Sequence, residues 1–222
     1  MEKIKRNSSV LFIALAFAVS TLYGCSETKE LSTKEDNQEI IAASNKGKKS
    51  ELIPEQSKLE WEGKKVTGKH NGTINIISGD LTEDNGKLTG GNFVVDFNSI
   101  KVLDLQDEGM NAKLTGHLKS EDFFSAEKFP SGKFVITSAA PLKDGSDNNY
   151  TINGDLTIKG ITNNISFPAK VNIGDNGITA SADFNIDRTL WDIRYGSGKF
   201  FEGLGDKMIN DEFNIKFKIA SK

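Results

Sequence analysis

The sequence predicts an all-β fold, an antiparallel barrel of eight strands. Apolar and polar residues alternate in about eight segments, and turn residues such as Gly, Asn and Asp separate most of them. No long helical pattern alternates with these segments, so a parallel sheet is not expected. Because nearly every segment has one apolar and one polar face, closure would bury the apolar faces and leave no exposed sheet edge.

The clearest pattern is a hairpin at residues 150–171. Its apolar face is formed by Tyr150, Ile152, Gly154, Leu156, Ile158, Ile165, Phe167, Ala169 and Val171. Residues 159–164 contain a glycine and two asparagines and are expected to form the turn. The opposite face carries mostly polar side chains, so the hairpin needs an apolar interior on one side and water on the other.

The other strands are predicted on the same alternation. In chain order, the predicted strands are 58–62, 72–76, 93–98, 133–137, 150–158, 165–171, 178–186 and 213–219. A barrel of eight strands is wide enough to enclose one small ligand. A strand of ten residues spans about 33 Å, which is long enough to surround an extended chain molecule.

Residues 111–129 break the alternation. Apolar residues recur there at roughly helical spacing, and Ser120 precedes two acidic residues. We expect a short helix or a pair of turns that crosses over one end of the barrel. Its apolar face would consist of Leu114, Leu118, Phe123, Phe124 and Phe129, and residues 114–129 would be able to act as a lid.

Residues 1–24 have the features of a lipoprotein signal peptide. Three basic residues precede an apolar stretch at 10–22, which is shorter than the roughly 20 residues that a spanning helix needs. The stretch ends in Leu-Tyr-Gly-Cys at 22–25, which resembles a bacterial lipobox, where the cysteine receives a diacylglyceryl group. The alternative is an ordinary secretory signal followed by a chance cysteine. Cys25 is the only cysteine, which excludes a disulfide within the chain.

Residues 25–50 are expected to form a flexible tether between the lipidated Cys25 and a barrel domain at 51–222. Charged residues, Ser and Asn dominate this segment, and its apolar residues are too few to compensate for ordering. Acyl chains on Cys25 would hold the protein to a bacterial membrane without a spanning helix. The domain would then lie in the periplasm or at the cell surface.

Five motifs follow one another in order across residues 54–220. They are 68–72 (GKHNG), 114–120 (LTGHLKS) with 122–124 (DFF), 128–130 (KFP), 154–160 (GDLTIKG), and 187–189 (DRT) with Trp191 and 195–196 (YG). Together they resemble the YceI-like family. The resemblance implies an extended, lipocalin-like eight-stranded barrel that binds a polyisoprenoid or another long lipid, usually in the periplasm. The lipobox departs from many members, which carry a simple cleaved signal.

The inward faces of the strands are the main candidate for ligand binding. The residues predicted to line a tunnel are Phe93, Val95, Phe97, Tyr150, Ile152, Phe167, Phe184, Phe213, Ile215 and Phe217. Leu114, His117, Leu118, Phe123, Phe124 and Trp191 are added as contacts from the crossing segment and the late motif. An apolar tunnel would gain about 0.8 kcal/mol per buried CH₂ of a lipid chain. The alternative is that these side chains fill the core and leave no cavity.

Arg188 and Arg194 are the only arginines after the signal region, and they flank Trp191. The planar guanidinium group suits carboxylate or phosphate, and it stacks on aromatic rings. One hypothesis is that one of them contacts the polar end of a bound lipid at the barrel mouth. The alternative is a structural ion pair with Asp187 or Asp192.

Little in the sequence favours a metal site, a cofactor or an enzyme. His70 and His117 are the only histidines, and their spacing is not that of a metal site, so structural hydrogen bonds are expected. No nucleophile–base motif or phosphate-binding loop is present. The formal net charge of −3 gives no case for nucleic-acid binding.

The sequence therefore favours a non-enzymatic lipoprotein that binds a polyisoprenoid or other long apolar lipid, an isoprenoid quinone included, for storage, transport or sequestration. The alternative function is that of a surface lipoprotein that acts through protein contacts with a filled, ligand-free barrel. The oligomeric state stays open, a dimer included.

Overall fold

The structure is a computed structural model that describes residues 41–42 and 47–222. The predicted signal peptide, the predicted lipidation site Cys25 and most of the predicted tether lie outside the described residues.

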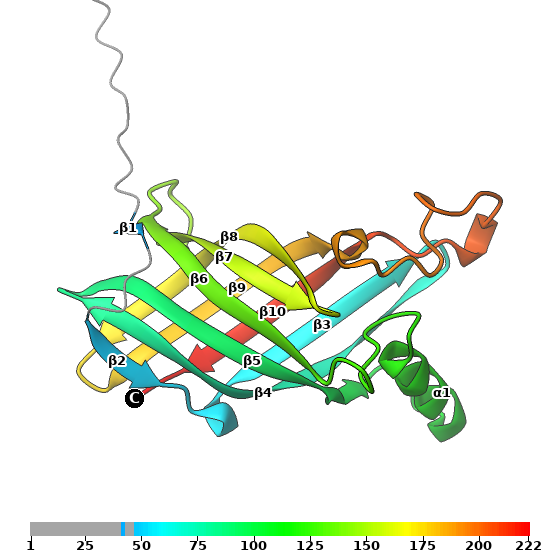
Figure 1. The fold of residues 1–222 in the computed structure, drawn as a ribbon, viewed down its shortest axis with the longest axis horizontal. Helices are drawn as coiled ribbons and strands as arrows, with labels where there is room; N and C mark the ends of the chain where they lie inside the picture. Colours follow the sequence, from blue (N-terminus) through cyan, green and yellow to red (C-terminus); the bar gives the residue numbers. More distant parts are fainter. Residues whose placement is uncertain (1–40, 43–46) are drawn as a thin grey trace, which may run out of the picture. The chain divides into compact units, whose positions relative to one another are not determined.

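Eight antiparallel strands close into a barrel (Figure 1). They are β3 (Lys58–Lys65), β4 (Gly68–Asp84), β5 (Lys87–Val102), β6 (Ser131–Pro141), β7 (Tyr150–Ile158), β8 (Ile161–Gly174), β9 (Gly177–Asp187) and β10 (Glu212–Ala220). The hydrogen-bonded order is β6-β5-β4-β3-β10-β9-β8-β7, and the pairing of β7 with β6 closes the ring. The predicted all-β, eight-stranded antiparallel fold is confirmed.

Two further strands precede the barrel. β1 (Ile41–Ala42) pairs with β6, and β2 (Lys48–Glu51) pairs with residues 80–83 of β4. β3 pairs with β4 only as far as Ile74, so the edge at 80–83 would otherwise lack a neighbour on that side. Residues 41–42 and 48–50, which belong to the predicted tether, pair with strands of the barrel.

The hairpin of β7 and β8 has a tighter turn than predicted. Ile158 pairs with Ile161, so the turn consists of Lys159 and Gly160 alone. Their φ angles are 51° and 74°, the pair of positive values that a two-residue hairpin turn of this hand requires. Residues 161–164, which were predicted as turn, therefore belong to β8.

The crossing segment contains one helix, α1 (Glu108–Lys119), followed by turns up to residue 129. The Asp107 side chain caps the helix by accepting a hydrogen bond from the Met110 N–H at 2.8 Å. The helix therefore begins earlier than the predicted segment. Leu118 is buried, and α1 lies at the end of the barrel where β5 finishes (Figure 1).

A long connection between β9 and β10 lies at the same end of the barrel as α1 (Figure 1). It contains two short 3₁₀ helices, η2 (Arg188–Trp191) and η3 (Gly205–Lys207). A third, η1 (Pro54–Gln56), precedes β3. No helix among residues 41–42 and 47–222 is long and apolar enough to cross a membrane.

The apolar core forms two clusters. The first includes Leu81, Leu88 and Ile178, which lie near the β4–β5 and β8–β9 turns. It also includes Ala139 of β6, and all four side chains are almost fully buried. We refer to that end as the packed end. The second includes Phe97, Leu118, Trp191 and Ile193 and lies toward α1. We refer to that end as the α1 end.

Candidate ligand-binding cavities

A cavity of about 110 Å³, here named the central cavity, lies inside the barrel. It is lined by Leu59, Ile74, Ile76, Phe93, Val95, Phe97, Phe124, Gly132, Lys133, Phe134, Leu156, Ile158, Ile165, Phe167, Phe184, Ile186, Phe213, Ile215, Phe217 and Ile219. The lining is apolar except for Lys133. All eight barrel strands contribute residues to it, because the inward positions of each strand alternate with outward ones.

The exposure of the inward side chains fits a cavity better than a filled core. Phe93, Phe184 and Ile215 point inward yet are only partly buried. Their remaining accessible surface faces the central cavity that they line. The prediction left a tunnel and a filled core as alternatives, and the structure has an internal space.

Aromatic rings form much of the cavity wall. Phe167 stacks on Phe184 with ring centroids 4.1 Å apart, and Phe97 stacks on Phe124 at 4.6 Å. Aromatic pairs of this kind add about 0.5–1.5 kcal/mol beyond the area that they bury. The free volume is below the roughly 150 Å³ of a cavity that admits benzene, so a long chain has to displace some of these rings.

A second cavity of about 80 Å³, here named the end cavity, lies toward the α1 end. It is lined by Trp61, Gly63, Ile74, Leu118, Phe123, Phe124, Arg188, Ile193, Ile209, Asn210 and Phe213. Ile74, Phe124 and Phe213 line both cavities, so the two spaces are neighbours along the barrel.

Trp61 lines the end cavity and carries a buried donor without a partner. Its Nε1 is buried and has no hydrogen-bond partner among the described residues. Trp61 pairs with Gly72 of β4, and a Cβ at that glycine would come within 2.7 Å of the indole ring. Gly72 thus leaves the space in which the indole lies. An unpaired buried donor costs about 1–3 kcal/mol.

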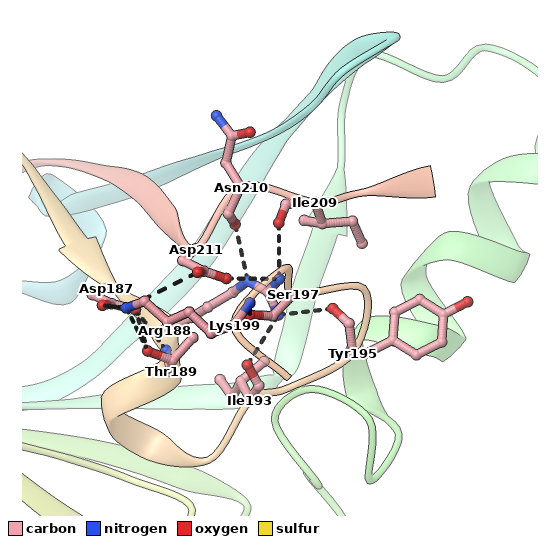
Figure 2. A network of polar contacts seen from close by, with 10 residues as sticks. All are labelled: Asp187, Arg188, Thr189, Ile193, Tyr195, Ser197, Lys199, Ile209, Asn210 and Asp211. Carbon is pink, nitrogen blue, oxygen red and sulfur yellow. Dashed lines mark hydrogen bonds and ion pairs between the residues drawn. The ribbon is translucent and has the colours of Figure 1, made fainter. Parts of the chain in front are cut away.

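Arg188 is buried and its donors are used within the protein (Figure 2). Nε donates to the Asn210 carbonyl at 3.0 Å, and Nη2 donates to the Ile209 carbonyl at 3.1 Å. Nη1 donates to the carbonyls of Ile193 and Tyr195, both at 2.9 Å. The guanidinium group therefore ties the two halves of the β9–β10 connection together.

The ion-pair partner of Arg188 is Asp211, with Nη2 and Oδ1 3.5 Å apart, and not Asp187 or Asp192 as the structural alternative predicted. Burial lowers the pKa of Arg188, and the carboxylates of Asp211 and Asp187 act in the opposite direction. This geometry favours a structural role for Arg188. Arg194 is exposed, forms an ion pair with Asp192 and lies over the Phe200 ring.

Asp187 belongs to the same network. It accepts hydrogen bonds from the Thr189 hydroxyl at 2.6 Å and from Lys199 Nζ at 2.6 Å. Burial of Asp187 raises its pKa, but the hydrogen bonds from Lys199 and Thr189 outweigh this effect, so the pKa lies below its usual value. Ion pairs thus fix the start and the middle of the connection to each other.

Most of the predicted ligand-binding residues line one of the two cavities. Phe93, Val95, Phe97, Phe124, Phe167, Phe184, Phe213, Ile215 and Phe217 line the central cavity, and Leu118, Phe123, Phe124, Arg188 and Phe213 line the end cavity. Those on β5, β8, β9 and β10 occupy the inward faces of these strands.

Six predicted residues line neither cavity: Leu114, His117, Tyr150, Ile152, Trp191 and Arg194. Tyr150 and Ile152 belong to the core of the packed end, where the Tyr150 hydroxyl accepts a hydrogen bond from the Leu88 N–H. Trp191 is fully buried and donates from Nε1 to the Leu156 carbonyl at 2.9 Å. Leu114 packs against the core of the α1 end.

The two histidines make hydrogen bonds with aspartates, in line with the expectation of structural roles. His117 Nε2 lies 2.9 Å from Asp122, and its ring contacts Phe123 and Tyr195 edge-on. His70 Nδ1 lies 2.7 Å from Asp104. No group of residues that could hold a metal ion is found in the described part of the chain.

The prediction missed lining residues on strands that it had identified. Leu59, Trp61, Ile74, Phe134 and Ile165 all occupy inward positions of predicted strands. Leu59, Trp61, Ile74 and Ile165 each have polar residues on both sides in the sequence, which was a sufficient signal for an inward position. The unpaired indole N–H could not be found this way, because pairing depends on three-dimensional neighbours.

A family model described as a YceI-like domain matches residues 51–221, the same region that forms the barrel and its cavities. The chain belongs to the YceI-like family. Among curated relatives, a UPF0312 protein of Shewanella denitrificans is 33% identical over 98 residues, which cover 44% of this chain and 47% of the relative. A UPF0312 protein of Pseudomonas putida is 32% identical over 101 residues, covering 46% and 48%. The match to this YceI-like chain spans about half the length of each relative.

Two solved structures share the YceI-like barrel. BcnA of Burkholderia cenocepacia superimposes with a TM-score of 0.60 at 22% identity, covering 77% of this chain and 99% of BcnA. A polyisoprenoid binding domain from Saccharophagus degradans superimposes with a TM-score of 0.57 at 13% identity, covering 80% and 99%. At these sequence identities, the structural similarity shows a shared fold and nothing more.

Proposed function

We propose that the barrel binds a polyisoprenoid or another long apolar lipid, and that it stores, transports or sequesters this lipid without catalysis. The observation that carries the proposal is the central cavity, an almost entirely apolar space inside the barrel to which all eight strands contribute residues. The description of the Saccharophagus degradans neighbour as a polyisoprenoid binding domain supports it.

Burial of the chain supplies the affinity in this proposal. Each CH₂ group taken from water contributes about 0.8 kcal/mol, so a few isoprene units bind without a polar contact. The central cavity is narrower than such a chain needs, so partly buried rings of its wall, such as Phe93 and Phe134, would have to turn aside. The turns after α1 place Phe124 between the two cavities, where residues 114–129 would act as a lid.

Mass spectrometry of organic extracts tests the proposal. The full chain is purified from a native-like host, and a long isoprenoid at near one-to-one stoichiometry is expected. Two neighbouring valines on β5 provide matched variants. Val95 lines the central cavity, whereas Val94 does not and pairs with Ser78 and Lys133, both exposed. Val95→Phe is expected to reduce the bound lipid several-fold, and Val94→Phe is expected to leave it unchanged.

An empty extract, together with no uptake of added polyprenol, would overturn lipid binding. The alternative function, a surface lipoprotein that acts through protein contacts, would then account for the same fold. Equal lipid content in the Val95→Phe and Val94→Phe proteins would place the lipid outside the barrel.

We also propose that Cys25 carries acyl chains that anchor the protein to a bacterial membrane, with the barrel in the periplasm or at the cell surface. The Leu-Tyr-Gly-Cys pattern at 22–25 supports this proposal. Metabolic labelling with a fatty acid tests it. Label is expected in the wild type and not in Cys25→Ser, which should also leave the membrane fraction. Label retained in Cys25→Ser would refute the proposed site.

A further inference from the structure

We propose that a cluster of exposed apolar side chains at the α1 end docks onto the surface of a phospholipid bilayer, with which the barrel exchanges its lipid. This cluster, here named the apolar tip, consists of Val66, Tyr195, Phe200, Phe201 and Met208. The exchange of lipid rests on the proposed function, whereas docking can be measured whether or not the barrel holds a lipid.

Exposed apolar side chains gather at one end of the barrel. Ten large apolar side chains are exposed in the part of the chain that the structure describes. Nine of them lie in the β3–β4 turn, just after β5, in α1, at the β7–β8 turn or in the β9–β10 connection, all at the α1 end. The exception is Ile77 of β4. Exposed apolar residues that are scattered need no explanation, but a concentration of them at one end indicates an interaction surface.

The apolar tip joins two segments that are distant in the sequence. The Val66 N–H donates to the Met208 carbonyl at 3.4 Å, which ties the β3–β4 turn to the β9–β10 connection (Figure 1). The N–H groups of Phe200 and Phe201 both donate to the Ser197 carbonyl, at 3.2 and 3.1 Å. The five side chains of the tip are nevertheless 39–57% exposed. The tip is thus built from a turn and a loop, whereas the common modes of peptide recognition need a groove or an open sheet edge.

Basic side chains accompany the apolar tip. Residues 64–69 and 194–208 contain six cationic side chains and two carboxylates. The nearest carboxylates of four of these cations are Glu62, Asp187 and Asp192, and with them included the cations still outnumber the carboxylates. The whole chain, in contrast, has a formal net charge of −3. Cations beside exposed aromatic side chains are typical of proteins that lie at the interface of a bilayer, where anionic headgroups attract them.

The apolar tip adjoins the end cavity. Tyr195 contacts Phe123, which lines the end cavity, and their ring centroids are 5.7 Å apart. Met208 directly precedes Ile209, which lines the same cavity. Because three residues line both cavities, apolar side chains extend from the tip to the central cavity. A bilayer at the tip would therefore lie at the end of the barrel from which these cavities begin.

New tryptophans test docking. Phe201 and Ile77 are equally exposed, at 49% each, and only Phe201 belongs to the tip, so Phe201→Trp and Ile77→Trp are matched variants of the full-length protein. Each is mixed with vesicles of phosphatidylcholine and phosphatidylglycerol that contain a brominated phospholipid, which quenches fluorescence within the bilayer. After subtraction of the wild-type emission, the emission of Phe201→Trp is expected to shift to shorter wavelength. It should also be quenched several-fold more than that of Ile77→Trp.

A probe in the other segment covers the case in which Phe201→Trp disturbs the connection. Val66 lies in the β3–β4 turn, and Val66→Trp is expected to show the same shift and quenching. Equal quenching at positions 66, 77 and 201 would overturn docking through the tip, as would no response to vesicles at positions 66 and 201. A shift that depends on protein concentration and not on vesicles would assign the tip to contact with a second copy and would also overturn docking.

A kinetic measurement tests the exchange of lipid. Phe201 lines neither cavity, so Phe201→Ser should leave the amount of polyprenol bound at equilibrium unchanged. The same variant is expected to slow the uptake of polyprenol from vesicles about tenfold, because it removes apolar surface that would enter the bilayer. Ile77→Ser is the matched control and should keep the wild-type rate.

The outcomes separate this proposal from the proposed function. An uptake rate in Phe201→Ser that equals the wild-type rate would overturn exchange through the tip while lipid binding stands. If the wild type takes up no polyprenol at all, the proposed function fails, and the exchange of lipid fails with it. The fluorescence of Phe201→Trp, Val66→Trp and Ile77→Trp then still decides whether the tip docks onto a bilayer.

Discussion

The two ends of the barrel use the same strands in different ways. At the packed end, Leu81, Leu88 and Ile178 are about 1% exposed and fill the interior. The central cavity is lined by residues of both core clusters, whereas the end cavity lies at the α1 end, where α1 and the β9–β10 connection also lie. The filled region around these three residues is therefore suited to stability, and the regions that border the cavities are suited to binding, a division that substitutions in each region can test.

The largest effect is expected at Arg188, which holds the covering connection of the α1 end in place. Arg188→Met removes a buried cation and leaves Asp211 and four backbone carbonyls without their donor. The free energy of unfolding should fall by about 3–5 kcal/mol, measured by urea denaturation. Arg194→Met is the matched control, because Arg194 is exposed and should change stability by less than about 0.5 kcal/mol. Similar losses for both variants would contradict the structural role of Arg188.

The second prediction compares two leucines, one in the filled core and one in the wall of the central cavity. Leu81→Ala at the packed end should lower the free energy of unfolding by about 2–5 kcal/mol, because it opens a new cavity in a filled region. Leu59 already borders the central cavity, so Leu59→Ala should cost less stability but should weaken lipid retention. Urea denaturation and lipid extraction of both variants measure the two effects. An equal loss of stability in Leu81→Ala and Leu59→Ala would indicate that the interior is equally well packed around both leucines.

The smallest effect concerns pH. The pKa of Asp187 is below its ordinary value of 3.8, because hydrogen bonds from Lys199 and Thr189 outweigh the opposing effect of burial. Its contribution to stability is therefore complete above about pH 4 and is lost as the pH falls through the lower folded-state pKa. In urea denaturation at several acidic pH values, Asp187→Asn should flatten the loss of stability in that range, and Lys199→Met should do the same. An unchanged slope in Asp187→Asn would show that the pair contributes nothing.

The strands could be predicted because alternation is a local property. Phe213, Ile215 and Phe217 alternate with polar neighbours, and each occupies the predicted inward face. The turn at Lys159 and Gly160 was predicted too long because Asn163 and Asn164 are common turn residues, whereas strand register decided the outcome. Local composition could not show that β2 completes an edge of β4, since that depends on where β3 stops.

The candidate site was less predictable than the fold. Alternation predicts which side chains point inward. Whether these side chains pack against one another or leave a space depends on the width of the barrel and on the side chains opposite. Tyr150 and Phe93 were both predicted to line a tunnel. In the structure, Tyr150 lies in the filled core and Phe93 lies in the cavity wall. Likewise, the carbonyl partners of Arg188 and the unpaired N–H of Trp61 arise from contacts between distant segments.

The attachment of β2 has a mechanical consequence. Residues 48–51 pair with β4, and residues 51–53 hydrogen-bond to residues 79, 220 and 222, so the chain enters the domain at the packed end. A pulling force transmitted from the N-terminal side would load the pairing of β1 with β6 first and then this network of backbone hydrogen bonds. Both sets of hydrogen bonds lie away from the end cavity. Tension on the protein would therefore leave the shape of the end cavity largely unstrained.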